Sequence, residues 1–255
     1  MRHGFIIPGG SASEQVELAV LAEEAGWDGV FVWEGGYALD AWSLLAAMAV
    51  RTRRVRLGTM LTPLPWRRPW KLAGQVATVD QLSNGRAILT VGVGAVDTGL
   101  GTYPEVADLR ERADLLDAGI DAVRGLWEGD DHAGGLDLST SIRKGPTPVQ
   151  DPLPIWVVAI PGRPKSMRRA LRCDGVVPQS NDPAEVAALL TWLDDNGGRR
   201  PAFDVVVEGE TTPGDASPVE PWHGIATWWL ESRWMTEDPD EVRGRIEAGP
   251  VPSAG

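Results

Sequence analysis

The stretch from Val55 to Gly94 constrains the fold of this chain more than any other. Two short apolar runs, at 55–61 and 87–93, flank a segment whose apolar residues recur at helical spacing. The pattern predicts a strand, a helix that begins at Pro69 and ends at Ser83-Asn84-Gly85, and a second strand. Two strands joined by a helical crossover run parallel, with a right-handed connection. Ligands of such sheets bind beyond the carboxyl ends of the strands, so we expect a site just after these two runs.

The alternation of strand and helix continues along the whole chain. Short apolar runs that predict strands occur at 5–7, 30–33, 55–61, 87–93, 155–158, 175–177, 203–207 and 225–230. Helical patterns follow nearly all of them, and the region after the seventh run is reduced. The length of 255 residues fits one barrel of about 250 residues. The sequence therefore predicts an α/β fold, a TIM (β/α)8 barrel, with residues 1–255 as a single domain.

The composition narrows the class of partners. A net charge of −12 repels nucleic acid and anionic membrane surfaces. The apolar run before Pro8 is too short for a signal peptide, and no window approaches the roughly 20 apolar residues of a membrane span. The single cysteine, Cys173, excludes an internal disulfide and is expected in the core. These features predict a cytoplasmic protein that binds neither nucleic acid nor membrane.

One long segment lacks any periodicity. Residues 130–154 mix Gly, Asp, Ser and Pro, and a loop of this length within a compact domain is more often functional than accidental. We expect it to form a lid or rim at the site.

The turn after the fifth predicted strand has the composition of an anion site. Gly162, Arg163, Lys165 and Ser166 stand just before a helix, so free backbone N–H groups, a hydroxyl and two cations converge there. The turn is a candidate phosphate site, and the alternative is a solvated basic turn.

Other motifs are less specific. Gly92-Val93-Gly94 lacks the third glycine of a dinucleotide fingerprint, so its glycines either let the backbone approach a ligand or only form a tight turn. Trp33 and Trp66 follow strands, where a flat ring could stack on a cofactor or pack in the core. The three histidines are far apart and predict no metal site.

Several segments resemble the bacterial-luciferase-like (LLM class) flavin-dependent oxidoreductases. They are LGTMLTPLPWRRPWKLAGQVATVDQLSNGRAILTVGVG, LAEEAGWDGVFVWE, PLPIWVV, CDGVVP and GIATWWLESRW, which together run over nearly the whole chain. The resemblance implies a TIM barrel, here a short luciferase-like variant. It also implies that flavin mononucleotide (FMN), or in some branches coenzyme F420, binds at the carboxyl mouth, commonly in a homodimer.

The resemblance also assigns residues. Met60-Leu61-Thr62 corresponds to a bulged segment that supports the cofactor ring and often contains a non-prolyl cis peptide. Gly94 and Ala95 correspond to the loop that approaches the ring edge. The PGRPKS turn, with Gly162, Arg163, Lys165 and Ser166, corresponds to the loop that holds the cofactor phosphate. Trp33 is a further candidate for a cofactor contact, because of its position at a strand end and not because of the resemblance.

The chain departs from the family at two positions. Many members have an acid followed by His after the second strand, where this chain has Glu34-Gly35. The deazaflavin-dependent dehydrogenases have an acid where this chain has Ala95. Because the proton donor of the dehydrogenase type is missing, Glu34 is the remaining candidate for a catalytic residue.

These observations favour an enzyme, a luciferase-like monooxygenase that uses reduced FMN and O2. A separate flavin reductase would supply the reduced flavin, and the substrate would be a small organic molecule. An oxygenase tolerates a missing proton donor because the cofactor carries the difficult step. Two alternatives are an F420-dependent hydride-transfer oxidoreductase and a flavin-binding barrel without catalytic turnover.

Overall fold

The computed structural model describes residues 1–94, 105–139, 145–234, 236 and 238–252. The strands are β1 (Arg2–Ile7), β2 (Gly29–Val32), β3 (Arg56–Thr59), β4 (Thr62–Pro63), β5 (Ala87–Gly92), β6 (Ile155–Ala159), β7 (Gly175–Pro178), β8 (Asp204–Gly209) and β9 (Trp228–Glu231). The helices are α1 (Ala12–Glu24), α2 (Ala41–Arg51), α3 (Pro69–Ser83), α4 (Leu109–Glu128), α5 (Pro164–Ala170), α6 (Pro183–Asp195) and α7 (Pro239–Glu247). Short 3-10 turns within the described residues are η1 (Leu64–Trp66), η3 (Ala133–Gly135) and η4 (Glu220–Trp222).

Among the described residues, eight parallel strands close into a barrel. Strand β1 pairs with β2 on one side and with β9 on the other. Strand β3 pairs with β5, which completes the ring through β6, β7 and β8. The two-residue strand β4 is an extra pairing on β5 just above the end of β3. The predicted TIM barrel is confirmed.

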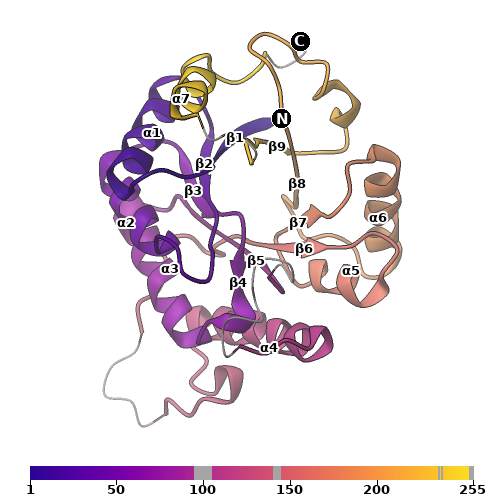
Figure 1. Ribbon diagram of the computed structural model, residues 1–255. Coiled ribbons are helices and arrows are strands. Elements are labelled where there is room, and N and C mark those ends of the chain that lie inside the picture. The colour runs from indigo at the N-terminus through magenta and orange to yellow at the C-terminus, as the bar shows by residue number, and fades with distance from the viewer. Residues whose placement is uncertain (95–104, 140–144, 235, 237, 253–255) are drawn as a thin grey trace.

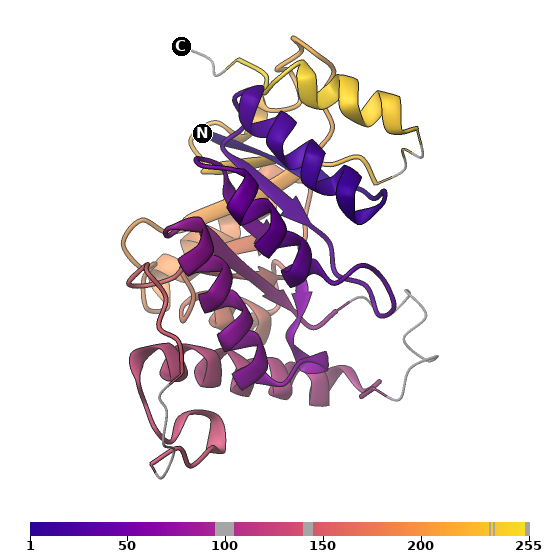
Figure 2. The same ribbon diagram turned by 90° about the vertical axis from the view of Figure 1, so that its left-hand side faces the viewer.

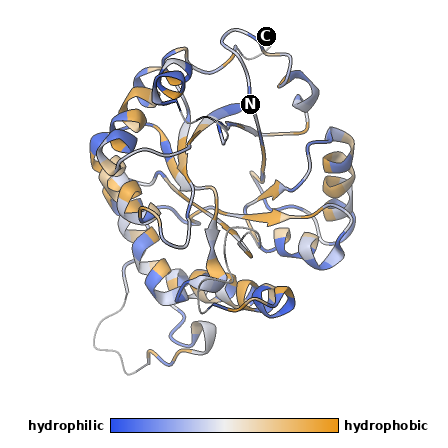
Figure 3. Ribbon diagram, viewed as in Figure 1, coloured by the Kyte–Doolittle hydropathy of each residue, from blue (hydrophilic) through white to orange (hydrophobic). Residues whose placement is uncertain are grey.

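The helices form the outer ring that parallel strands require (Figure 1). Helices α1, α2 and α3 lie side by side along one flank (Figure 2). Between β8 and β9 the described connection contains only the short turn η4, so the expected reduction after the seventh barrel strand is confirmed. Figure 3 shows the corresponding pattern of hydropathy, with apolar strands inside and helices of mixed character outside.

Local sequence signals set the helix ends. Ser11 and Glu14 form a capping box at the start of α1. Asp40 caps α2 through the backbone N–H of Ser43. Helix α3 begins at Pro69 and ends at Asn84, which adopts the left-handed conformation with φ 57°. These devices fix where each helix leaves and rejoins the barrel.

Alternation along the strands divides the core into two layers. Phe5 and Ile7 face the helices, whereas Ile6 faces the barrel interior. The interior is filled by eight buried side chains, Ile6, Phe31, Ile88, Trp156, Val177, Val206, Trp228 and Leu230. We call Phe31, Trp156 and Trp228 the aromatic layer, because their ring centroids lie 5.5 to 5.9 Å apart.

Glycines make room for the aromatic layer. A Cβ atom on Gly58 would lie 2.9 Å from the ring of Phe31, and one on Gly175 would lie 2.5 Å from the ring of Trp156. Any larger residue at these strand positions would displace a ring, so the glycines serve packing.

Arg86 connects two helices and a strand by hydrogen bonds at the amino-terminal end of the barrel. Its buried guanidinium donates hydrogen bonds to the carbonyl oxygens of Ala49, Thr52, Val55 and Ser83, and to the Thr52 hydroxyl, at 2.6 to 3.0 Å. These acceptors lie at the end of α2, just before β3 and at the end of α3. The arginine of the LSNGR motif is therefore a structural anchor.

The described parts of segment 130–154 lie at this same end. The carboxylate of Asp80, at the end of α3, accepts hydrogen bonds from the backbone N–H groups of Val149 and Gln150 at 2.7 and 3.0 Å. The Gln150 side chain also bonds to the carbonyl oxygen of Ala87 at the start of β5. The prediction of a lid was wrong, because a segment that joins a helix to the next strand returns to the amino-terminal end of a barrel. Positions 140–144 lie outside the described residues.

Cys173 is fully buried, as expected of a core residue. Burial raises the pKa of its thiol to about 12, so the thiol stays protonated and unreactive. None of the helices within the described ranges has the length and apolar character needed to cross a bilayer.

Candidate functional site

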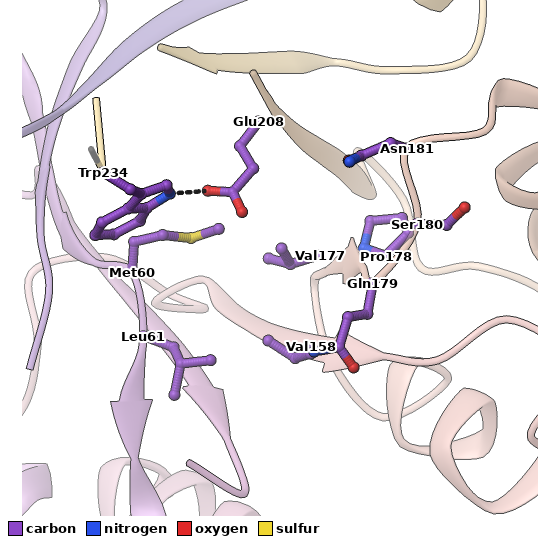
Figure 4. Close-up of a pocket in the computed structure, with 10 residues that line it drawn as sticks. All are labelled: Met60, Leu61, Val158, Val177, Pro178, Gln179, Ser180, Asn181, Glu208 and Trp234. Atoms are coloured by element: carbon purple, nitrogen blue, oxygen red, sulfur yellow. Dashed lines mark hydrogen bonds between the residues drawn. The ribbon is translucent and has the colours of Figure 1, made fainter. Parts of the chain in front are cut away.

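A pocket opens at the carboxyl ends of the strands, where ligands of such barrels bind. Its volume is about 380 Å³, within the usual range of ligand sites. It is lined by Met60, Leu61, Val158, Val177, Pro178, Gln179, Ser180, Asn181, Glu208 and Trp234 (Figure 4). Met60 and Val158 also pack against the barrel interior, so the pocket lies directly above the interior side chains.

Met60 and Leu61 form one wall, just after β3. The peptide bond between them is cis, although Leu61 is not proline. The cis bond at this position agrees with what the family resemblance implied. Leu61 and Val158 line the same pocket, which places the ends of β3 and β6 on one face of the barrel.

Glu208 is the ionisable side chain among the described lining residues. It lies on β8 two positions after Val206, which faces the barrel interior, so both point inward. The indole Nε1 of Trp234 donates a hydrogen bond to its Oε2 atom at 3.3 Å. Burial raises the pKa of Glu208, and the bond from Trp234 opposes that shift.

Glu34 lies beside the mouth, outside the lining of this pocket. Its carboxylate accepts a hydrogen bond from the Thr62 hydroxyl at 2.9 Å and another from Nε of Arg67 at 2.6 Å. Burial raises the pKa of Glu34, and the Arg67 guanidinium opposes the shift. Thr62 also accepts a hydrogen bond from the indole of Trp42 at 3.1 Å. This network joins the end of β2 to β4 and η1, while a catalytic role for Glu34 stays a prediction.

The position of the Trp33 ring accounts for a glycine at position 35, directly after Glu34. Its indole Nε1 donates a hydrogen bond to the carbonyl oxygen of Pro8 at 2.8 Å, and the side chain is 39% exposed. A Cβ atom on Gly35 would lie only 2.7 Å from the Trp33 ring. The ring thus occupies the space that a side chain at position 35 would need, and a contact of Trp33 with a cofactor stays a prediction.

Gly94 follows β5 with φ 79°, a conformation that favours glycine. The guanidinium of the fully buried Arg112, near the start of α4, donates hydrogen bonds to the carbonyl oxygens of Val93 and Gly94. Arg112 thereby holds this loop at the mouth. Ala95, the other residue expected at the ring edge, lies outside the described residues.

The turn at 162–166 follows β6. Gly162 has φ 74°, and Arg163 and Lys165 are exposed. The Ser166 hydroxyl accepts a hydrogen bond from the backbone N–H of Ile160 at 3.0 Å, which closes the turn. The four residues therefore come together as expected, and their contact with a phosphate stays a prediction.

Sequence reasoning missed most of the far wall of the pocket. Val177 and Pro178 end β7 and residues 179–181 follow it; of these, only the strand was predicted. Glu208 had a signal that could have found it, because it directly follows the apolar run at 203–207 and so stands at a strand end. Trp234 lies three residues beyond β9 in a stretch without periodicity, and its only signal was its place at the end of the GIATWWLESRW segment that resembles the family. In the part of the chain that the structure describes, no three His, Cys, Asp or Glu side chains gather to hold a metal ion.

The family model described as luciferase-like monooxygenase matches residues 2–248, which is nearly the whole chain. The chain belongs to this family. It is similar over its full fold to the monooxygenase RslO1 from Streptomyces bottropensis, with a TM-score of 0.76, 22% identity and coverage of 97% of both chains. At this identity the likeness supports the fold alone.

Two curated relatives of this luciferase-like protein carry different cofactors in their names. It is 42% identical over 125 residues to the F420-dependent glucose-6-phosphate dehydrogenase of Amycolatopsis mediterranei, over 45% of this chain and 38% of that protein. It is 32% identical over 155 residues to the oxygenase component of the flavin-dependent trigonelline monooxygenase of Acinetobacter baylyi, over 57% of this chain and 42% of that protein. The chain spans about two fifths of the length of each, and a flavin or deazaflavin cofactor is supported by both.

Proposed function

We propose that this protein is a flavin-dependent monooxygenase that uses reduced FMN and O2 to oxidise a small organic substrate. The observation that carries the proposal is the pocket of about 380 Å³ at the mouth, with apolar walls from Met60, Leu61, Val158 and Val177. A site that excludes water protects the oxygen chemistry that reduced FMN supplies when bound. The protein then contributes positioning and shielding.

The residues present fit a flat heterocyclic cofactor. Met60 and Leu61 provide an apolar surface for a ring, and the amides of Gln179 and Asn181 can pair with its polar edge. In this proposal Gly94 and Ala95 approach the ring edge. Gly162, Arg163, Lys165 and Ser166 hold the phosphate, because two exposed cations and free N–H groups suit an anion.

The proposal extends to partners. A separate reductase supplies the reduced flavin, which is motivated by the oxygenase-component name of the Acinetobacter relative. A homodimer is expected from the family resemblance.

Hydride transfer with coenzyme F420 is the second candidate. It is favoured by the identity of 42% to the F420-dependent dehydrogenase of Amycolatopsis. The carboxyl of Glu208 could handle the proton that such a reaction moves. A flavin-binding barrel without turnover is the third, motivated by the engagement of Glu34 with Thr62 and Arg67.

The experiment is to purify the protein, release any bound chromophore, and identify it by absorbance and mass. Refilling the protein with FMN or with F420 then allows two assays in parallel. Oxygen consumption that depends on reduced FMN and on added substrate supports the monooxygenase. Substrate-dependent bleaching of F420 without oxygen consumption supports the dehydrogenase, and binding of FMN with neither activity supports the third candidate.

A further inference from the structure

We propose that Glu208 determines the substrate class of this pocket. Its carboxylate accepts a hydrogen bond from a neutral or cationic donor on the substrate, and its charge excludes anionic substrates such as sugar phosphates and carboxylates. This inference rests on the proposed function, because it assigns the pocket to a small organic substrate next to a cofactor.

The geometry directs the carboxyl into the pocket. Glu208 stands at the inward-facing end of β8, and Figure 4 shows its carboxyl turned toward the space between Met60 and Val177. The bond from Trp234 occupies Oε2, which leaves the second oxygen free to accept from a ligand. Trp234 thereby fixes the direction of the carboxyl.

The lining offers this carboxyl no cation. Among the described lining residues there is no Lys, Arg or His. Arg233, next to Trp234 in the chain, is engaged by Glu231 at 3.3 Å and by Glu210 at 3.3 Å. The undescribed stretches that follow β5 and β9, residues 95–104 and positions 235 and 237, contain no basic residue in the sequence.

The remaining polar groups suit a neutral ligand. The Ser180 hydroxyl donates to Glu185 at 2.6 Å, so its proton is engaged. The amides of Gln179 and Asn181, which the proposed function assigns to the cofactor edge, carry no charge. A ligand anion would therefore meet the Glu208 carboxylate with no cation among the described lining residues to offset the repulsion.

The test uses three probes of matched shape: benzylamine as the cation, benzyl alcohol as the neutral compound and benzoate as the anion. Their dissociation constants are measured by calorimetry with the FMN-saturated protein near about pH 8, where the amine is protonated and a carboxylate is ionised. We expect benzylamine to bind at least about tenfold more tightly than benzoate. Equal or tighter binding of benzoate would overturn the proposal.

The variant Glu208→Gln keeps the shape and removes the charge. It should reduce the preference for benzylamine over benzoate to about threefold or less. Glu210→Gln is the matched control, because Glu210 is an exposed acid on the same strand end, outside the pocket lining, and it should leave the preference unchanged. Circular dichroism and thermal melting establish that both variants fold. An unchanged preference in Glu208→Gln would refute the assignment.

Two further readouts separate this inference from the proposed function. If FMN fails to bind, the proposed function fails, but the charge preference is still measurable with the cofactor-free protein. If Glu208→Gln changes the affinity for riboflavin about tenfold or more and leaves the dissociation constants of the three probes unchanged, Glu208 faces the cofactor ring. The assignment of Glu208 to the substrate would then be wrong.

Discussion

Replacing Arg86 by Lys should destabilise the barrel strongly without altering ligand binding. The Arg86 guanidinium makes five hydrogen bonds, four of them to backbone carbonyl oxygens, in a buried corner at the amino-terminal end. A lysine ammonium has three donors on a longer, unforked stem. At least two acceptors therefore lose their partner.

The magnitude follows from these two acceptors. A buried acceptor left without a partner costs about 1–3 kcal/mol, so we expect a loss of about 3 kcal/mol in the free energy of unfolding. That is a large part of the ~5–15 kcal/mol that stabilises a typical protein. For a chain of this length it corresponds to a decrease in melting temperature of about 6–12 °C.

The assay is urea unfolding followed by circular dichroism and by tryptophan fluorescence. Arg51→Lys is the matched control, because Arg51 is half exposed and its ion pair with Glu17 is long, at 3.6 Å. The control should change stability by less than about 0.5 kcal/mol. FMN affinity of folded Arg86→Lys should stay within about twofold of the unsubstituted protein, since Arg86 lies at the end opposite the pocket. A stability loss no larger than that of the control would refute the anchoring role.

Three further outcomes are expected. Lys165→Ala should weaken FMN binding about tenfold and leave riboflavin binding unchanged, because riboflavin lacks the phosphate; equal effects on both ligands in titrations would refute the phosphate site. Burial raises the pKa of Glu208 in the folded protein, so ionisation of its carboxyl destabilises the fold as pH rises. The melting temperature of Glu208→Gln should therefore increase relative to that of the unsubstituted protein between about pH 4 and about pH 8. A difference in melting temperature that stays the same over this pH range would contradict the expectation. Asp80→Asn should speed hydrogen exchange at the amides of Val149 and Gln150 by about tenfold or more, and unchanged exchange would show that another contact holds that segment.

The elements were predictable because their signals are local. Pro69 as a helix start and Asn84 as a left-handed helix end depend on a few neighbouring residues, so the sequence alone placed α3 within a residue. The barrel followed from counting alternations of strand and helix. Met60 and Leu61 were predicted at the mouth because strand ends are easy to locate.

The remaining parts of the site depend on contacts between distant residues. Glu208 and Trp234 are 26 positions apart in the chain and are joined by a hydrogen bond. No local sequence pattern predicts such a contact. The error at 130–154 has a different cause. Its length and composition were interpreted as functional, but its order in the chain, between a helix and the next strand, decides which end of the barrel it occupies.

The aromatic layer also has a kinetic consequence. Because the rings of Phe31, Trp156 and Trp228 fill the barrel beneath the pocket, the described residues leave no route for molecules along the barrel axis. A compound therefore enters and leaves the pocket on the carboxyl side of the barrel. When two compounds occupy it together, the deeper one has to enter first and leave last. For two such compounds, the order of binding would then depend on the closed barrel core as well as on affinity.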